Sequence, residues 1–443
     1  MAHLTPTLHT GHALHDTAYA KAVRDVAGSV TDNTFVAGES WPTVWVRDAA
    51  YAIDLGAGLL HPSVAAASLR GVVGTGSVWP QDRAAHFGGW PRLTDSIVGA
   101  VGAWACYTAT GDLDFLRWSH DVTRTTLARA EREVLDGGLF LGCASFMESN
   151  SAYPPRFAFR GRAVGATTAL STNVLYHRAY TLAARAARLL GEDPDPFETR
   201  ATTLGKAIDD RLWRPDRGHY AYYEDDRPSD RWEGLGNALA ALWHVADDDQ
   251  AASIFRTVRP TRNGLPCLWP PYPLWTSRLL RDEYFYHNGM VWPFVQGYWA
   301  WAAASRGAAA VFATELTTLA TLAARATTYH EFYHPDTARP GGSARQLWSA
   351  AGYLAMVHHG LLGISFDEEI HFQPVVPPGF TSVRLSNLPH RAMTLDLRIT
   401  GTGTITRLDL DGTPRPEFSI PAGLTGRHRV DITLARPGTG TVV

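Results

Sequence analysis

The stretch from Thr328 to Ile364, TYHEFYHPDTARPGGSARQLWSAAGYLAMVHHGLLGI, joins two kinds of sequence. Its first half is dense in aromatic residues, prolines and glycines, which is typical of a loop. Its second half, Leu347 to Leu362, is apolar nearly all round, which is typical of a helix buried on every side. The stretch therefore predicts a helix deep inside a helical domain, with a loop at its N-terminal end.

Segments of two kinds alternate between Ala13 and about Gly363. Trp292–Ala304 is apolar all round like Leu347–Leu362, whereas 115–134 and 197–213 are amphipathic with an Arg/Asp face. Inner and outer rings of helices would produce this alternation. The pattern predicts an all-α domain built as an (α/α)6 toroid.

The pattern changes after Ile364 to short alternating runs broken by Gly, Pro and Asn, among them TSVRLSNLP, MTLDLRITG and HRVDITLARP. Such runs predict a small C-terminal antiparallel β-sandwich. We therefore expect a helical catalytic domain over residues 1–365 and a β-sandwich domain over 366–443. Few aromatic residues and no carboxylate clusters occur in this tail, so we expect it to pack on the helical domain rather than to bind substrate.

The composition limits the possible partners. The formal net charge is -3, from 40 basic and 43 acidic residues without a long run of either sign, which argues against nucleic acid or an anionic membrane as partner. No segment approaches ~18 uninterrupted apolar residues, and the start of the chain does not resemble a signal peptide. We expect a cytoplasmic protein, a monomer or small homo-oligomer, that binds a small neutral carbohydrate.

Loops that lead into the inner helices of a toroid converge at one mouth, so residues that precede each apolar helix are the candidates for a site. Aromatic side chains there can stack on sugar rings, and polar ones can hold hydroxyls. The candidates are Trp45, Arg47, Asp48, Trp79, Asp95, Glu148, Glu233, His287, Asn288, Trp292 and Glu331.

Two of these carboxylates, Glu148 and Glu331, lie in loops rich in aromatic residues and proline. Hydrolysis of a glycosidic bond needs such a pair, one to protonate the leaving oxygen and one to act opposite it. The alternatives are ordinary: Asp48, Asp95 and Glu233 could cap helices, the two loop glutamates could be plain surface groups, and about half of the tryptophans could be core.

Several motifs resemble those of a known family. They are WVRDAAY (45–51), LTDSIVGAVGAWACYTATGDLDFL (93–116), SFMESNSAYPPR (145–156) with STNVLYHRAY (171–180), YHNGMVWPF (286–294) and YHEFYHPDTARPGGSARQLWSAA (329–351). Together they resemble the six-hairpin glycosidases, most closely the amylo-1,6-glucosidase domain of glycogen debranching enzymes. A more distant similarity extends to glucoamylases, trehalase-like enzymes, and glucosylglycerate or mannosylglycerate hydrolases.

The resemblance implies an exo-acting, inverting glycoside hydrolase for an α-linked glucoside or a related small glycoside. Glu148 would be the general acid and Glu331 the general base, with Arg47 and Asp48 on hydroxyls of the terminal sugar and Trp45 and Trp292 as stacking faces. Trp79, Asp95, Glu233, His287 and Asn288 would make further substrate contacts. The chemistry needs no metal and no organic cofactor. Debranching-type relatives usually carry Asp at the position of Glu148, whereas glucoamylases carry Glu.

Three other classes use a similar toroid. A sugar epimerase or isomerase would use histidines such as His287, His330 and His334 for proton transfer, and a polysaccharide lyase would need basic groups around a uronate. A toroid that kept the fold and lost activity would only bind sugar. Release of a reducing sugar from an α-glucoside would distinguish the hydrolase from all three.

Overall fold

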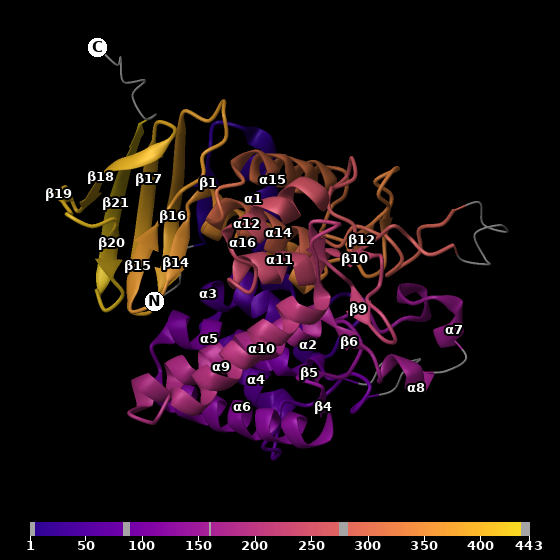
Figure 1. The fold of residues 1–443 in the computed structure, drawn as a ribbon. Coiled ribbons are helices and arrows are strands. Elements are labelled where there is room, and N and C mark those ends of the chain that lie inside the picture. The colour runs from indigo at the N-terminus through magenta and orange to yellow at the C-terminus, as the bar shows by residue number, and fades with distance from the viewer. Residues whose placement is uncertain (1–4, 83–88, 159–160, 274–281, 436–443) are drawn as a thin grey trace, which may run out of the picture.

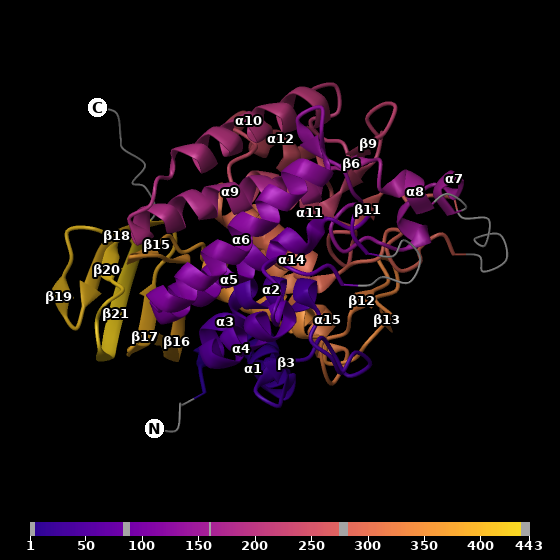
Figure 2. The same cartoon turned by 90° about the horizontal axis from the view of Figure 1, so that it is seen from below.

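The structure is a computed structural model that describes residues 5–82, 89–158, 161–273 and 282–435. Helices form its larger part, and a β-sheet lies at one side of them (Figure 1). Short strand pairs lie on the opposite side, as the view from below also shows (Figure 2). This arrangement agrees with a helical toroid followed by a β domain.

Six helices in the described chain lie next to one another in a ring, since each contacts the next and α16 contacts α2. These inner helices are α2 (Val46–Ala52), α5 (Val98–Thr110), α9 (Leu170–Leu190), α11 (Gly234–Leu242), α14 (Pro293–Ser305) and α16 (Leu347–Ala355). Every residue of α11 and α16 is buried, and so is nearly every residue of α14, as their apolar sequences predicted.

Further helices pack outside the ring, each against at least one inner helix. They are α1 (Ala13–Gly28), α4 (Pro62–Val73), α6 (Leu113–Glu133), α10 (Asp195–Leu212), α12 (Asp248–Thr257) and α15 (Ala309–Ala324). Helices α6 and α10 bury one face and expose a charged one, as predicted from their amphipathic sequences. Caps fix the starts of two outer helices: Asp112 accepts hydrogen bonds from the first turn of α6, and Asp247 and Gln250 form a capping box on α12.

Shorter elements complete the helical part. Single turns are α3 (Gly58–Leu60), α7 (Pro155–Ala158), α8 (Gly161–Val164), the 3-10 turns η2 (Asp95–Ile97) and η3 (Asn150–Ala152), and the π-helical turns η1 (Ile53–Ala57) and η4 (Met356–Leu361). The short strand pairs are β2 (Val30–Thr31) with β3 (Thr34–Phe35), β4 (Leu135–Asp136) with β5 (Leu139–Phe140), β6 (Thr168–Ala169) with β9 (Tyr223–Glu224), β7 (Trp213–Arg214) with β8 (His219–Tyr220), β10 (Trp232–Glu233) with β11 (Leu268–Trp269), and β12 (Phe332–Tyr333) with β13 (Pro340–Gly341). Within the described residues no helix is both long and apolar enough to span a membrane.

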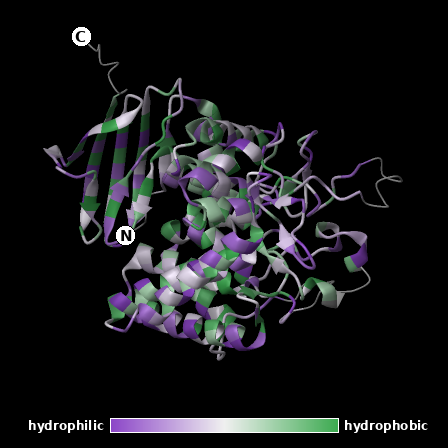
Figure 3. Ribbon diagram, in the orientation of Figure 1, coloured by the Kyte–Doolittle hydropathy of each residue, from purple (hydrophilic) through white to green (hydrophobic). Residues whose placement is uncertain are grey.

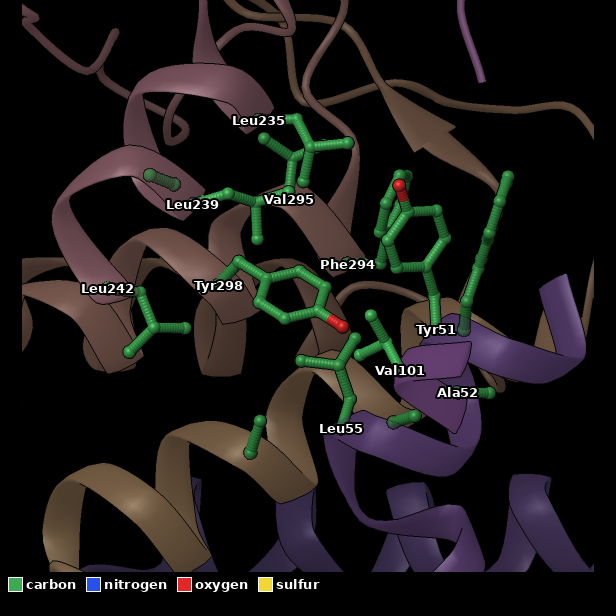
Figure 4. Packing of buried hydrophobic residues seen from close by; sticks show 14 of the residues in the cluster. Tyr51, Ala52, Leu55, Val101, Leu235, Leu239, Leu242, Phe294, Val295 and Tyr298 are labelled. Carbon is green, nitrogen blue, oxygen red and sulfur yellow. The ribbon is translucent and has the colours of Figure 1, made fainter. Parts of the chain in front are cut away.

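The core fills the inside of the ring. Figure 4 shows side chains from η1, α5, α11 and α14 meeting there, among them Leu55, Val101, Leu239 and Tyr298. All four are buried, so the ring encloses a packed interior. A site can therefore form at an end of the ring, where the loops lie.

The β-sheet has the strand order β1-β16-β17-β21-β18-β19, and a second sheet has the order β14-β15-β20. The strands are β1 (Thr7–His9), β14 (Ile364–Phe366), β15 (Glu369–Phe372), β16 (Ser382–His390), β17 (Met393–Thr400), β18 (Thr404–Leu410), β19 (Thr413–Pro414), β20 (Ser419–Pro421) and β21 (Gly426–Ala435). Apolar and polar residues alternate along them (Figure 3), which is the pattern of a sheet with one covered face.

Two features of the sheet differ from the sequence prediction. The pairing is not antiparallel throughout, because β21 inserts between β17 and β18 and pairs with β17 in parallel. Since β17 and β18 run in opposite directions, a strand between them can be antiparallel to only one. The sheet also includes β1, from the N-terminal end of the chain, which the boundary predicted near residue 365 did not anticipate.

The closest approach between inner helices depends on glycine. A Cβ atom on Gly297 of α14 would lie 2.6 Å from the Cα of Gly352 of α16, which is closer than atoms can pack. We expect Gly297→Ala to destabilise the protein by about 1–3 kcal/mol, the usual cost of overpacking. The urea midpoint at constant m-value measures this.

Gly71→Ala is the matched control, because Gly71 also lies inside a helix but has open space around it. It should leave stability unchanged or raise it by about 0.5–1 kcal/mol. Equal midpoints for the two variants would contradict the close contact between α14 and α16.

Candidate active site

A cavity of about 460 Å³ opens at the N-terminal ends of the inner helices. Its volume falls in the range of about 300–1,000 Å³ that is usual for small-molecule sites. Residues of α2 and α16 and of the loops before α2, α9, α14 and α16 line it: Ala37, Trp41, Trp45, Arg47, Asp48, Phe146, Glu148, Ser149, Phe285, Tyr286, His287, Trp292, Glu331, Gln346 and Trp348. Seven of the eleven sequence-predicted residues are thus brought together.

Arg47 is the central cation of the site. It lies in the first turn of α2, is 4% exposed, and donates a hydrogen bond from Nη1 to Oε2 of Glu148 at 2.9 Å. Asp95 Oδ2 lies 3.6 Å from Nη1, and Asp82 Oδ2 lies 3.7 Å from Nε. Burial lowers the pKa of Arg47, but Glu148, Asp95 and Asp82 together raise it well above its usual value. The guanidinium therefore stays charged and holds three carboxylates around it.

Glu331 is held by donors from three segments. Its Oε2 accepts the backbone N–H of Ser343 at 2.8 Å and the indole N–H of Trp41 at 3.4 Å, and its Oε1 accepts the hydroxyl of Tyr286 at 3.4 Å. Burial raises the pKa of Glu331, these three donors lower it, and the charge of Glu148 raises it further. The two glutamates are therefore close enough to interact electrostatically while each has its own anchors.

Asp48 also lines the cavity, one residue after Arg47. Its Oδ1 accepts a hydrogen bond from Nε2 of Gln346 at 2.9 Å. Burial raises the pKa of Asp48 well above its usual value, Arg47 opposes that effect, and the nearby carboxylates Asp82, Glu331 and Glu148 add to it. A carboxyl group with these neighbours suits hydrogen bonding to a neutral ligand.

His287 lies under the cavity against aromatic rings. Its ring stacks at a tilt on Tyr286, with centroids 4.0 Å apart, and contacts Trp292 at 4.9 Å. Burial, together with the charge of Arg47, lowers the pKa of His287 well below its usual value. The imidazole is therefore neutral, and it is not a cationic acid.

Asp95 and Glu233 do not line the cavity, contrary to the sequence prediction. Asp95 is fully buried and accepts the Ser145 hydroxyl and the Phe146 backbone N–H, both at 3.0 Å. It thereby holds the loop that carries Glu148, while Phe146 adopts a left-handed φ of 59°. Asp95 is a positioning residue.

Glu233 is fully buried at the start of α11 and accepts the Ser171 backbone N–H at 2.7 Å, which ties α11 to the start of α9. Burial raises its pKa to about 8, and Ser171 lowers it. The capping alternative is also wrong for Asp48, Asp95 and Glu233, since each accepts its hydrogen bond from another segment.

Trp79 and Asn288 likewise lie outside the cavity lining. The Trp79 indole donates to Thr123 of α6 at 3.0 Å and its ring packs on Trp118, so it joins a loop to an outer helix. Asn288 is fully buried, and its amide group bonds the backbone of Tyr272 and Glu283. Both side chains are occupied in holding loops.

Several cavity residues were not predicted. Gln346 and Trp348 lie at the start of α16, where the rule applied to the other inner helices would have found them. Trp41 precedes Trp45 in a loop rich in tryptophan, and Tyr286 precedes His287. Asp82, which contacts Arg47 without lining the cavity, was not predicted either. Within the described residues no cluster of three or more His, Cys, Asp or Glu side chains could hold a metal ion.

Residues 144–349 match the family model of the mannosylglycerate hydrolase MGH1-like glycoside hydrolase domain. This segment contains both Glu148 and Glu331. No curated protein sequence matches the chain significantly. The matching family model is of the mannosylglycerate hydrolase type, which the sequence motifs resemble more distantly than they resemble amylo-1,6-glucosidase domains.

Solved structures show the same fold at low sequence identity. The GH63 mannosylglycerate hydrolase from Thermus thermophilus in complex with glucose is 18% identical, with a TM-score of 0.62 over 77% of this chain and 100% of that chain. A GH78 family rhamnosidase of Bacillus sp. GL1 is 15% identical, with a TM-score of 0.65 over 98% of this chain and 44% of that chain. These likenesses show the fold, and the match of residues 144–349 to a glycoside hydrolase domain supports hydrolase activity and the resemblance to the six-hairpin glycosidases.

The position of Glu331 depends on Gly342, in the GG pair of its motif. Gly342 has a left-handed φ of +69°, and a Cβ atom there would lie 2.3 Å from Oε2 of Glu331. We expect Gly342→Ala to displace this carboxylate and to lower kcat/KM on an aryl glycoside by about 10²-fold, the usual effect of a displacement of about 1 Å.

Gly191→Ala controls for backbone strain, because Gly191 has a φ of +75° and open space around it. It should cost about 1–2 kcal/mol of stability and leave kcat/KM unchanged. A fully active Gly342→Ala variant would show that Glu331 does not need this placement.

Proposed function

We propose that the protein is an exo-acting, inverting glycoside hydrolase for a small neutral glycoside, an α-linked glucoside or a close relative. Glu148 is the general acid and Glu331 the general base. One observation carries the proposal: both carboxyl groups line the same small cavity, and each is held by different hydrogen-bond donors. They are also close enough for the charge of Glu148 to raise the pKa of Glu331. An inverting pair needs such an arrangement, with roughly 6.5–9.5 Å between the groups to admit a water.

The anchors suit the two roles. Within the described residues, Glu148 is hydrogen-bonded only through Oε2, which leaves Oε1 available to carry the proton for the leaving oxygen. Its side chain is 17% exposed, so it can reach a ligand in the cavity. Glu331 accepts three hydrogen bonds and would accept a proton from a water on the opposite face of the sugar ring.

The walls of the cavity suit a sugar. The indole N–H groups of Trp45 and Trp348 and the Nδ1 atom of His287 are buried and have no hydrogen-bond partner in the described part of the chain. Buried polar atoms without partners are costly, and ligand hydroxyls would satisfy them. Asp48 with its Gln346 partner would hold hydroxyls of the terminal sugar beside Arg47.

Two aromatic side chains mark the mouth of the cavity. Trp41 is 43% exposed and Phe285 is 55% exposed, and both belong to the lining. Exposed aromatic rings beside a sugar site offer faces for the leaving group, while the terminal sugar lies deeper near Trp292. This arrangement supports exo action. The Thermus thermophilus relative, described in complex with glucose, shows a neutral hexose bound by a protein of this fold.

The alternatives find less support in the site. Of the three histidines considered for an epimerase, only His287 lines the cavity, and it is neutral. A lyase acting on a uronate would place a negative charge beside Asp48, Glu148 and Glu331, with Arg47 already surrounded by carboxylates. A toroid that only binds sugar would not need the paired glutamates.

We also propose that the ring of inner helices with its outer layer is the predicted (α/α)6 toroid. Its first three hairpins would be α1 with α2, α4 with α5, and α6 with α9. The contacts of α4 with α5 and of α6 with α9 support the second and third hairpins. The proposed boundary near residue 365 falls where η4 ends and β14 begins, with β1 added to the sheet from the other end of the chain.

Substitution of the two glutamates tests the mechanism. Glu331→Gln keeps size and polarity but cannot accept the proton from water, so kcat should fall by ~10²–10⁴-fold while substrate still binds. Glu148→Gln should harm hydrolysis of a disaccharide far more than that of an activated aryl glycoside, because only the poor leaving group needs protonation. The initial product, followed by NMR, should have the anomeric configuration opposite to that of the substrate.

Two controls complete this test. Azide should rescue neither variant through a glycosyl-enzyme intermediate, since none forms in an inverting reaction. Glu315→Gln changes a buried glutamate that bonds Gln296 outside the cavity, and it should leave the leaving-group dependence unchanged. Retention of configuration, or full activity of Glu331→Gln, would refute the proposed mechanism.

The pH profile tests the state of Glu331. A general base must be ionised to accept a proton, and burial raises the pKa of Glu331. As the pH is lowered, activity should therefore be lost at a pH above the usual pKa of a glutamate side chain. Trp41→Phe removes a hydrogen bond that lowers this pKa and should move the acidic limb of kcat/KM to still higher pH. Trp45→Phe changes a cavity tryptophan whose indole N–H has no hydrogen-bond partner among the described residues, and it should leave that limb in place. An acidic limb unmoved by Trp41→Phe would assign it to another group.

A further inference from the structure

A second cavity, of about 120 Å³, lies at the other end of the inner helices. Trp301 of α14 forms part of its wall, nine residues beyond Trp292 of the catalytic cavity, which corresponds to about 13 Å along a helix. Ser365 and Phe366 of β14 also line it, so it lies where the sheet meets the helices, on the side away from the catalytic loops (Figure 1). The cavity is thus separate from the site described above.

The cavity contains an arginine, Arg178, that has neither an ion pair nor a hydrogen bond among the described residues. The Nε atom of Arg178, on α9, is buried, and the described residues provide neither a hydrogen bond to its guanidinium nor a carboxylate within 4.0 Å. Its one described aromatic contact is the ring of Trp243, 5.4 Å from Cζ. Burial lowers the pKa of Arg178 to about 10, so the group is still a cation at pH 8. A buried cation in this state is costly.

The second arginine of the cavity, unlike Arg178, is paired with a carboxylate. Arg185, two turns further along α9, forms an ion pair with Asp367 and lies over the ring of Trp104, 4.5 Å from its centroid. Arg185 is therefore compensated by protein groups. Arg178 lies in the same cavity and lacks both an ion pair and a hydrogen bond in the described structure.

Asp54 is the nearest candidate to neutralise Arg178, but its carboxylate is used elsewhere. Its Oδ2 accepts the hydroxyl of Tyr298 at 2.7 Å, and it interacts with Arg178 only through space. Burial raises the pKa of Asp54 to about 6, while Tyr298 and Arg178 lower it. Asp54 is therefore ionised at pH 8 and would weaken the binding of another anion there.

Another part of the lining is aromatic. The ring of His359 stacks on Trp301 with centroids 3.8 Å apart, and its Nδ1 lies 2.8 Å from the carbonyl oxygen of Ile364. Burial lowers the pKa of His359 to about 4, so it adds no charge near neutral pH. The cavity combines one free guanidinium with an aromatic wall.

We propose that this cavity binds a small oxyanion, of the sulfate, phosphate or carboxylate class, on the guanidinium of Arg178. Guanidinium groups present paired N–H donors that match two oxygens of such an anion. The volume corresponds to roughly four water molecules at about 30 Å³ each, which admits an ion of this size. The bound anion would connect α9 with the start of the sheet.

The test uses sulfate, whose charge is constant over the pH range, titrated into the full-length protein at pH 8 and constant ionic strength. Calorimetry should show saturable binding, and crystals soaked in selenate should give an anomalous peak beside Arg178. Arg178→Gln should weaken sulfate at least 10-fold, and Asp54→Asn, which removes the competing charge, should tighten it several-fold. Arg188→Gln changes an exposed arginine of the same helix that already pairs with Glu198, and it should have no effect.

Ala105→Leu provides an independent variant should Arg178→Gln not fold. Ala105 lines the cavity, and a larger apolar side chain fills space without changing charge, so sulfate should again bind at least 10-fold more weakly. The proposal is overturned if no saturable binding occurs, if selenate binds elsewhere, or if sulfate affinity is the same in the wild type and in these cavity variants. Glycosidase activity is not part of the readout, so the result is independent of the proposed catalytic mechanism.

Discussion

The buried guanidinium of Arg47 is the interaction on which the site depends. It draws together carboxylates from two segments that are distant from it in sequence: Asp82 and Asp95 between α4 and α5, and Glu148 in the loop before α9. Without that cation, three acidic groups in one poorly solvated place would repel one another and would each be costly to bury. Glu148 and the loops that flank it are therefore positioned by one residue of α2.

The helical ring explains why one arginine can reach so many partners. Inner helices that contact their neighbours bring all their N-terminal ends to one end of the ring, although α2 and α16 lie about 300 residues apart in sequence. The same ends carry free backbone N–H groups and loops. Polar chemistry gathers where the helices begin, and the middle of the ring contains packed apolar residues such as Leu55 and Leu239 (Figure 4).

Sequence alone could predict the helical domain, its inner and outer helices, and the sheet. The spacing of apolar residues is a local signal, and it is visible directly in Leu347–Leu362 and in 115–134. Sequence reasoning also placed Arg47, Glu148 and Glu331 at one cavity, where the structure has them. It could not distinguish residues that face the cavity from those that support it. Asp95 and Glu233 are acidic and lie at the start of inner helices, like residues that do line the cavity. Their side chains instead bond neighbouring segments, which the sequence alone does not reveal. The parallel pairing of β21 was likewise hidden, since strand order is a long-range property.

Contacts do run from the catalytic end of the ring towards the second cavity, but they do not form a continuous polar path. The Tyr51 hydroxyl bonds Ser145, which bonds Asp95, and at the far end Tyr298 bonds Asp54. Between these two parts the rings of Tyr51 and Tyr298 meet edge to face at 5.7 Å, a contact without a hydrogen bond. The groups that shift the pKa of Glu331 all lie at the catalytic end, so its protonation is set locally by Glu148 and by the three donors that hold it. Two ionic sites can thus coexist at opposite ends of one close-packed ring without either one fixing the charge of the other.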